Sequence, residues 1–258
     1  MKKSIALLIA LIFVISALSA CNLFGIGIGG QQPTTPRIII PTEGQTATEA
    51  AVVTEASVVE TESPATESVI GTLDDYVRVA KQATSYFDGN EKTVRIPEIV
   101  INSDDADAAN IEILNRFGED VQEYTEYMPI ISLDYEAYLS GKILSVVTTG
   151  RYDGGNSYGL CHVFDVTTGK ALDSKDVCTA ALTEYASAVS ALSTNLTAYY
   201  DEKYSALPGN DSEREKTLAD SNLSSAKMYL DNSGNLMALV DIYAAVGGGH
   251  WVAQISAQ

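Results

Sequence analysis

Basic residues are scarce in this sequence. Its 258 residues include 16 lysines and arginines against 34 aspartates and glutamates, so the net charge at pH 7 is −18. Nucleic-acid binding needs clustered cations that displace counterions from phosphates, and adhesion to an anionic surface needs them too. The shortage of basic residues excludes polyanions such as nucleic acid as partners, and it favours cationic partners. A hydrophobic content of 46% is nevertheless enough for a packed core.

Metal-ligand and catalytic patterns are also missing. The only histidines are His162 and His250, and no His-x-x-x-His pair, Cys-x-x-Cys pair or Asp-rich calcium loop occurs. Ser157, His162 and Asp165 could be combined into a triad, but Ser157 lies on no Gly-x-Ser-x-Gly elbow. His162 and Asp165 are three residues apart on one expected strand, so they face opposite sides. We expect no metal, no cofactor, no catalytic residue and no enzymatic activity.

Only one long hydrophobic run is present, over residues 5–18. Lys2 and Lys3 precede it, and Leu18-Ser19-Ala20-Cys21 follow, which resembles the lipobox of bacterial lipoproteins. Residues 1–20 are therefore expected to be a lipoprotein signal peptide. Acyl chains on Cys21 would anchor the protein to the bacterial cell membrane, facing outward. The alternatives are an ordinary signal peptide or an uncleaved anchor with a chance cysteine.

Aromatic residues are nearly absent from the next segment. Residues 21–70 are rich in Thr, Glu and Pro and contain Phe24 as their one aromatic. Such a segment cannot bury enough apolar surface to offset its ordering entropy, so a disordered tether is predicted. Residues 38–40, three isoleucines, could alternatively be a local docking segment.

Residues 71–258 have the composition of one folded domain, with a net charge of −15. Strand-like runs at residues 76–80 and 93–96 flank an Asp-Gly turn and predict a hairpin. Three further strands are expected at 130–135, 143–149 and 158–166, followed by a turn at 167–170. A second hairpin, 226–230 with 236–243, and a strand at 251–255 complete the sheet. A short polar helix is expected at 211–219.

Apolar residues spaced by three and four predict two long helices, over residues 104–127 and 176–204. The stripe of the first is Ile111, Leu114, Phe117, Val121, Tyr124 and Met128. The stripe of the second is Leu182, Tyr185, Val189, Leu192, Leu196 and Tyr199. The predicted fold class is α+β, a mainly antiparallel sheet with the two long helices packed on it.

Two residue groups in this domain invite a functional reading. Cys161 and Cys178 form an even pair outside the cytoplasm, so a possible disulfide would tie helix to sheet, contributing about 3 kcal/mol; buried free thiols are the alternative. Gly247-Gly248-Gly249 precede His250 and Trp251, but no helix start or lysine follows, as a phosphate loop would need. A bend explains the glycines better, and His250 with Trp251 is a possible ligand contact.

The domain resembles the extracytoplasmic domain of lysozyme-sensing anti-sigma factors, which also occurs in the N-terminal region of a peptidoglycan deacetylase. The motifs are Arg95-Ile96-Pro97-Glu98-Ile99, Tyr152-Asp153-Gly154-Gly155 and Phe164-Asp165-Val166-Thr167-Thr168-Gly169-Lys170. The family's Ala-His after Gly-Gly is replaced here by Asn156-Ser157, and its Pro-Tyr-Ala by Ala244-Ala245-Val246. The resemblance implies an accessory ligand-binding module, without a sigma-binding segment or a deacetylase domain.

Charge and resemblance together predict a surface lipoprotein that binds a protein or an envelope glycan. A cationic wall-lytic enzyme such as lysozyme is the concrete candidate partner, because an acidic domain would steer it. The alternatives are an accessory or catalytic protein of peptidoglycan modification and a structural or solute-binding lipoprotein.

Overall fold

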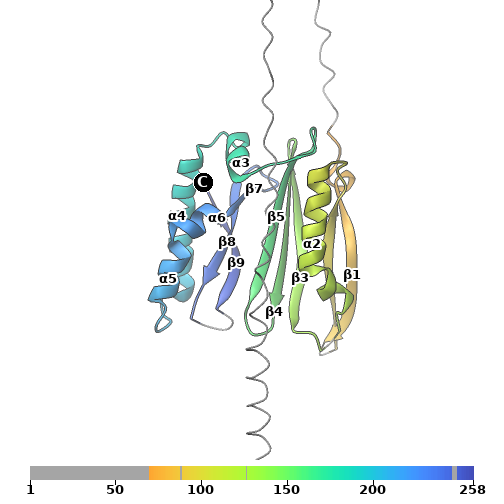
Figure 1. Ribbon diagram of the computed structural model, residues 1–258. Coiled ribbons are helices and arrows are strands. Elements are labelled where there is room, and N and C mark those ends of the chain that lie inside the picture. Colours follow the sequence, from red (N-terminus) through yellow and green to blue (C-terminus); the bar gives the residue numbers. More distant parts are fainter. Residues whose placement is uncertain (1–69, 88, 126, 246–248) are drawn as a thin grey trace, which may run out of the picture. The chain divides into compact units, whose positions relative to one another are not determined.

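The computed structural model describes residues 70–258, except 88, 126 and 246–248 (Figure 1). The chain divides into two units, residues 1–61 and 62–258, and every described residue belongs to the second. The expected signal peptide, its lipidation site Cys21 and the expected tether up to residue 69 lie outside the described residues. None of the described helices is both long and apolar enough to span a membrane.

The described residues form an α+β domain in which every pairing of strands is antiparallel. Its elements in chain order are η1 (Leu73–Asp75), β1 (Val77–Phe87), β2 (Asn90–Ile99), α2 (Asp104–Gln122), β3 (Ile130–Ser140), β4 (Ile143–Tyr152), β5 (Ser157–Asp165), β6 (Lys170–Ala171), α3 (Ser174–Ala180), α4 (Tyr185–Tyr204), α5 (Asp211–Leu218), α6 (Asp220–Ser225), β7 (Lys227–Leu230), β8 (Leu236–Tyr243) and β9 (His250–Ser256). The predicted α+β class, the predicted strands and the short polar helix are confirmed.

The strands of the described residues belong to three sheets. β1 pairs with β2, the order β3-β4-β5-β6 makes the second sheet, and β7-β8-β9 makes the third. Both predicted hairpins are present, and the first is interrupted by a register shift between Val79 and Lys81. Such an irregularity increases the local twist of an edge strand.

The second sheet separates two hydrophobic cores. On β4, Leu144 and Val146 face a core shared with α2 and β2, whereas Ile143 and Val147 face a core shared with α4 and β7–β9. Alternation along a strand produces this division, because successive side chains point to opposite faces. Figure 1 shows the result, with α2 and β1 on one side of β3–β5 and β7–β9 with α4–α6 on the other.

The buried face of α2 differs from the predicted stripe. Phe117 and Val121 are buried as expected, but Ile111 and Leu114 are 58% and 40% exposed. The helix also ends at Gln122, five residues before the predicted end. The residues that fill the core in place of the exposed pair are Ala106, Ala109 and Ile113. The pattern counted only large apolar side chains, so it overlooked the two alanines that mark the buried face.

The predicted helix over residues 176–204 is wrong as a single element. It is divided into α3 and α4 at Leu182, which has a φ of +55° and a side chain 95% exposed. The N–H of Leu182 donates to the carbonyl of Thr179, and that of Thr183 donates to the carbonyl of Cys178. These bonds close α3 with a left-handed residue, a common way to end a helix. No glycine or proline marks the break. The apolar spacing continues across it and therefore predicted a single helix.

Candidate functional site

The structure places His250 between two tyrosines. Its Nε2 lies 3.1 Å from Oδ1 of Asp241 on the neighbouring strand β8. Its ring centroid lies 5.4 Å from that of Tyr158 on β5 and 5.4 Å from that of Tyr243 on β8. The imidazole therefore bridges the second and third sheets through ring contacts.

Two cations close this row of rings at its ends. The guanidinium carbon of Arg116 on α2 lies 4.1 Å from the ring centroid of Tyr158. The Nζ of Lys216 on α5 lies 3.6 Å from the ring centroid of Tyr243. Cations over aromatic faces are attracted by the ring quadrupole. We call the five side chains from Arg116 to Lys216 the ring row; it connects α2, β5, β9, β8 and α5.

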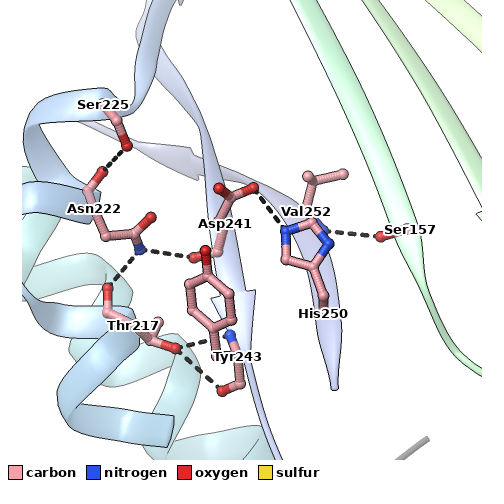
Figure 2. A network of polar contacts seen from close by, with 8 residues as sticks. All are labelled: Ser157, Thr217, Asn222, Ser225, Asp241, Tyr243, His250 and Val252. Atoms are coloured by element: carbon pink, nitrogen blue, oxygen red, sulfur yellow. Dashed lines mark hydrogen bonds and ion pairs between the residues drawn. The ribbon is translucent and has the colours of Figure 1, made fainter. Parts of the chain in front are cut away.

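A network of hydrogen bonds fixes the strand that carries Asp241 and Tyr243 (Figure 2). The hydroxyl of Thr217 donates to the carbonyl of Tyr243 at 3.1 Å and accepts from its N–H at 2.9 Å. The Asn222 amide donates to the carbonyls of Thr217 and Asp241, and Ser225 donates to the carbonyl of Asn222. Buried Thr217 and Asn222 are thereby satisfied, and α5 and α6 are held against β8.

The contacts of the ring row join elements of the domain, and one of its polar atoms is left without a partner in the described part of the chain. The Nδ1 of His250 is buried and has no hydrogen-bond partner among the described residues. One face of Tyr158 meets His250 and its ring also carries Arg116, yet the residue remains 37% exposed.

His250 and Trp251 are not brought together. Trp251 stacks on Tyr204 of α4, with ring centroids 6.0 Å apart and an angle of 28° between planes. It packs half-buried against the core of β7–β9, whereas His250 joins the ring row. A ligand contact by either residue stays a prediction.

The residues of the conceivable triad have separate structural roles. The Oγ of Ser157 accepts a hydrogen bond from the N–H of Val252 at 2.8 Å, which joins β5 to β9 (Figure 2). Asp165 is ion-paired with Lys142 at 2.7 Å. The nearest carboxylate to His162 is Glu112, at 3.8 Å. No hydrogen bond joins the three residues among those that the structure describes.

Cys161 and Cys178 are free thiols in the structure. Cys178 is buried, and Cys161 is half-buried on β5 against the same core. Burial raises the pKa of the Cys161 thiol to about 12 and also raises that of Cys178. Both thiols are protonated at neutral pH and so are poor nucleophiles. Their pairing in an oxidising environment stays a prediction.

The outward face of α2 combines exposed apolar side chains with carboxylates. Exposed Ile111 and Leu114 line a groove of about 520 Å³ between α2 and the β1–β2 hairpin. The Asn110 amide holds the helix to β2, donating to the carbonyl of Ile99 and accepting from its N–H. Five exposed carboxylates stand on the same helix, at Asp104, Asp105, Asp107, Glu112 and Glu119. We call this the α2 face.

Sequence reasoning missed most of these residues. Asp241 is an acid inside the otherwise apolar run of β8, and a charge in such a strand signals a specific partner. That signal would have marked Asp241 but not its partner His250. Tyr158, Arg116 and Lys216 carry no comparable signal, because only the fold brings them to the ring row.

Among the described residues, no group of three or more His, Cys, Asp or Glu side chains is placed to hold a metal ion. Comparison of the sequence with known proteins finds no matching family model and no matching curated protein.

Proposed function

We propose that the protein is a lipid-anchored surface lipoprotein whose domain binds a cationic protein through the α2 face. A wall-lytic enzyme such as lysozyme is the candidate partner. The observation that carries this proposal is the combination of exposed Ile111 and Leu114, the groove beside them and five exposed carboxylates on one helix. Apolar contacts would supply affinity, and the carboxylates would speed the encounter.

The preference for a basic partner would come from the carboxylates of the helix rather than from the groove lining, which contains Lys81 as well as Asp107 and Glu98. Glu98 on the groove wall is paired with Arg78 at 2.7 Å, so it adds little net charge. Asp107, at the rim, has no ion-pair partner within the described part of the chain. A basic side chain next to an apolar anchor would therefore meet both Asp107 and Ile111.

The remaining parts of the proposal concern the location of the protein and the role of its helices. Cys21 would carry the acyl chains, with residues 21–70 as the tether, so the domain would face outward from the bacterial membrane. The two long helices, α2 and α4, would serve as packed supports of the sheets, and α2 would add the binding face. The domain would act by binding alone, because its sequence contains no recognisable catalytic constellation.

The test is a titration of the full chain, in detergent, against hen lysozyme at 20 mM and 200 mM salt. We expect a dissociation constant in the micromolar range at low salt and at least tenfold weaker binding at high salt, because salt screens exposed charges. The absence of binding at tens of micromolar would reject lysozyme as the partner.

Matched variants locate the surface. Leu114→Ser should weaken binding about fivefold to tenfold, and Asp107→Asn should weaken it and flatten the salt dependence. Ile131→Ser is the control, because Ile131 on β3 is as exposed as Leu114, at 40%, and does not line the groove. Equal effects of the two serine variants would show that the α2 face is not the site.

A further inference from the structure

The strand β5 leaves part of its outer edge open. It pairs with β4 from Ser157 to Asp165, but β6 pairs with it only at Phe164 and Asp165. The carbonyl of Val163 accepts from the N–H of Leu172, so Val163 directs its main chain away from β4. Alternate residues of a strand direct these groups to the same side, so Gly159 and Cys161 also present theirs outward. No ladder covers them among the described residues.

A cavity lies on this open edge. It has a volume of about 340 Å³ and is lined on β5 by the four residues from Cys161 to Phe164. Asp105 on α2 stands on one side of it, Lys227 on β7 on the other, and Asp173 and Ser174 close one end. A second cavity of about 200 Å³ continues past Gly159, and Lys227 lines both. We call the two cavities and the open edge the β5 slot.

The polar groups in the slot are only partly satisfied. The Nε2 of His162 is buried without a hydrogen-bond partner among the described residues. Burial lowers the pKa of His162, more than the nearby Glu112 raises it, so the ring is neutral at pH 7. Asp105 Oδ2 accepts from the N–H of Ala171 at 2.8 Å, which leaves its other oxygen open. Such unsatisfied groups are costly unless a ligand or water meets them.

The charged residues that line the larger cavity favour a positively charged ligand. Its lining contains two carboxylates, Asp105 and Asp173, against one ammonium, Lys227. Glu112 adds a third carboxylate 3.8 Å from His162. A positively charged side chain would be favoured there, with the neutral imidazole as a further acceptor.

We propose that the β5 slot binds an extended peptide segment of a partner protein by strand addition. Its main chain would pair with the outward groups of Gly159 and Cys161, and a lysine or arginine side chain would enter the cavity beside Asp105 and His162. Strand addition takes its affinity from main-chain hydrogen bonds and its selectivity from pockets for alternate side chains. The slot shares Asp105 and Glu112 with the carboxylates of the α2 face, but it would bind its ligand at β5 rather than in the groove beside Ile111 and Leu114, so it does not rest on the proposed function.

The test uses the full chain and three capped pentapeptides. The first is acetyl-Thr-Val-Lys-Val-Thr-amide, the second has glutamate in place of lysine, and the third is the lysine peptide N-methylated at alternate residues. We expect the lysine peptide to slow hydrogen exchange at the Gly159 and Cys161 amides at least tenfold at millimolar concentration. The glutamate and N-methylated peptides should bind at least fivefold more weakly.

Asp105→Asn should reduce the preference for lysine over glutamate about fivefold, because the amide keeps the acceptor for Ala171 but removes the charge. Asp104→Asn is the matched control, since Asp104 precedes it on α2 and does not line the slot. No protection at the two amides, or equal binding of the N-methylated peptide, would overturn the proposal. Dimerisation through β5 that the lysine peptide does not reverse would also overturn it, because a second copy of the chain would then occupy the slot.

Discussion

At the scale of single residues, Asp165 explains a turn that the sequence only marks. Its Oδ1 accepts from the N–H and the hydroxyl of Thr167, and its Oδ2 lies 2.7 Å from the Nζ of Lys142. Gly169 follows with a φ of +72°, and a Cβ there would come within 2.9 Å of Ser103, the N-cap of α2. The run from Phe164 to Lys170 is therefore defined by a carboxylate that organises the turn and a glycine that allows it to close.

The charge of Asp165 should stabilise the fold in a pH-dependent way. Burial alone would raise its pKa, but the hydrogen bonds from Lys142 and Thr167 lower it to about 2. Because the folded pKa lies below the unfolded value of about 3.9, the stabilisation is complete above about pH 5 and is lost as the pH falls towards 2. Asp165→Asn should lower the free energy of unfolding by about 2 kcal/mol at pH 7. Urea unfolding at pH 7 and pH 2.5 measures this difference.

The control for this prediction is Asp153→Asn. Asp153 is exposed, and its carboxylate accepts only from the neighbouring Gly154 among the described residues. Its replacement should change stability by less than about 0.5 kcal/mol at either pH. A loss for Asp165→Asn that persists unchanged at pH 2.5 would contradict the electrostatic explanation.

At the scale of elements, the break between α3 and α4 is held by an unfavourable residue. Leu182 adopts the left-handed conformation with its side chain 95% exposed, so no packing compensates for the strain. Asparagine tolerates this conformation better than other non-glycine residues do. Leu182→Asn should therefore raise the free energy of unfolding by about 0.5–1 kcal/mol. Leu182→Ala keeps a Cβ but gains no such tolerance, so it should leave the free energy of unfolding nearly unchanged. Thermal unfolding of the two variants measures the difference, and equal midpoints would contradict the explanation.

The elements show where sequence patterns succeed and where they do not. Alternation and turn residues predicted both hairpins, because Gly89 and Gly234 stand at positive φ between the strands. The helix break lacks such a marker, since a leucine occupies the left-handed position. On α2 the period was correct and Phe117 and Val121 were placed correctly, but tertiary packing buried Ile113 rather than Ile111.

The candidate site was less predictable than the fold. His250 was singled out by the sequence, yet its partners Asp241, Tyr158 and Tyr243 lie on strands that only the topology brings together. The same holds for the β5 slot, whose lining comes from α2, β5, β7 and the segment before α3. Surfaces made by several elements depend on the arrangement of sheets, which local spacing does not specify.

At the scale of the whole domain, the two cores are joined through the second sheet. β4 contributes side chains to both cores, and the Oγ of its Ser145 accepts from the N–H of Leu230 on β7 at 3.1 Å. Tyr138 on β3 stacks on Tyr229 on β7, with centroids 5.9 Å apart. A shared buried strand and these links should make the cores unfold together rather than separately.

Trp251 allows this cooperativity to be measured, because it is the single tryptophan and packs in the core of β7–β9. Phe117→Ala removes a fully buried ring from the other core, at a cost of about 3–5 kcal/mol. If the domain is one cooperative unit, urea unfolding followed by Trp251 fluorescence should shift to lower denaturant by the same amount as unfolding followed by far-ultraviolet circular dichroism. Ile111→Ala, on the exposed side of the same helix, should shift neither signal by more than about 0.5 kcal/mol. A fluorescence midpoint that stays at its original value in Phe117→Ala would show instead that the two cores unfold independently of each other.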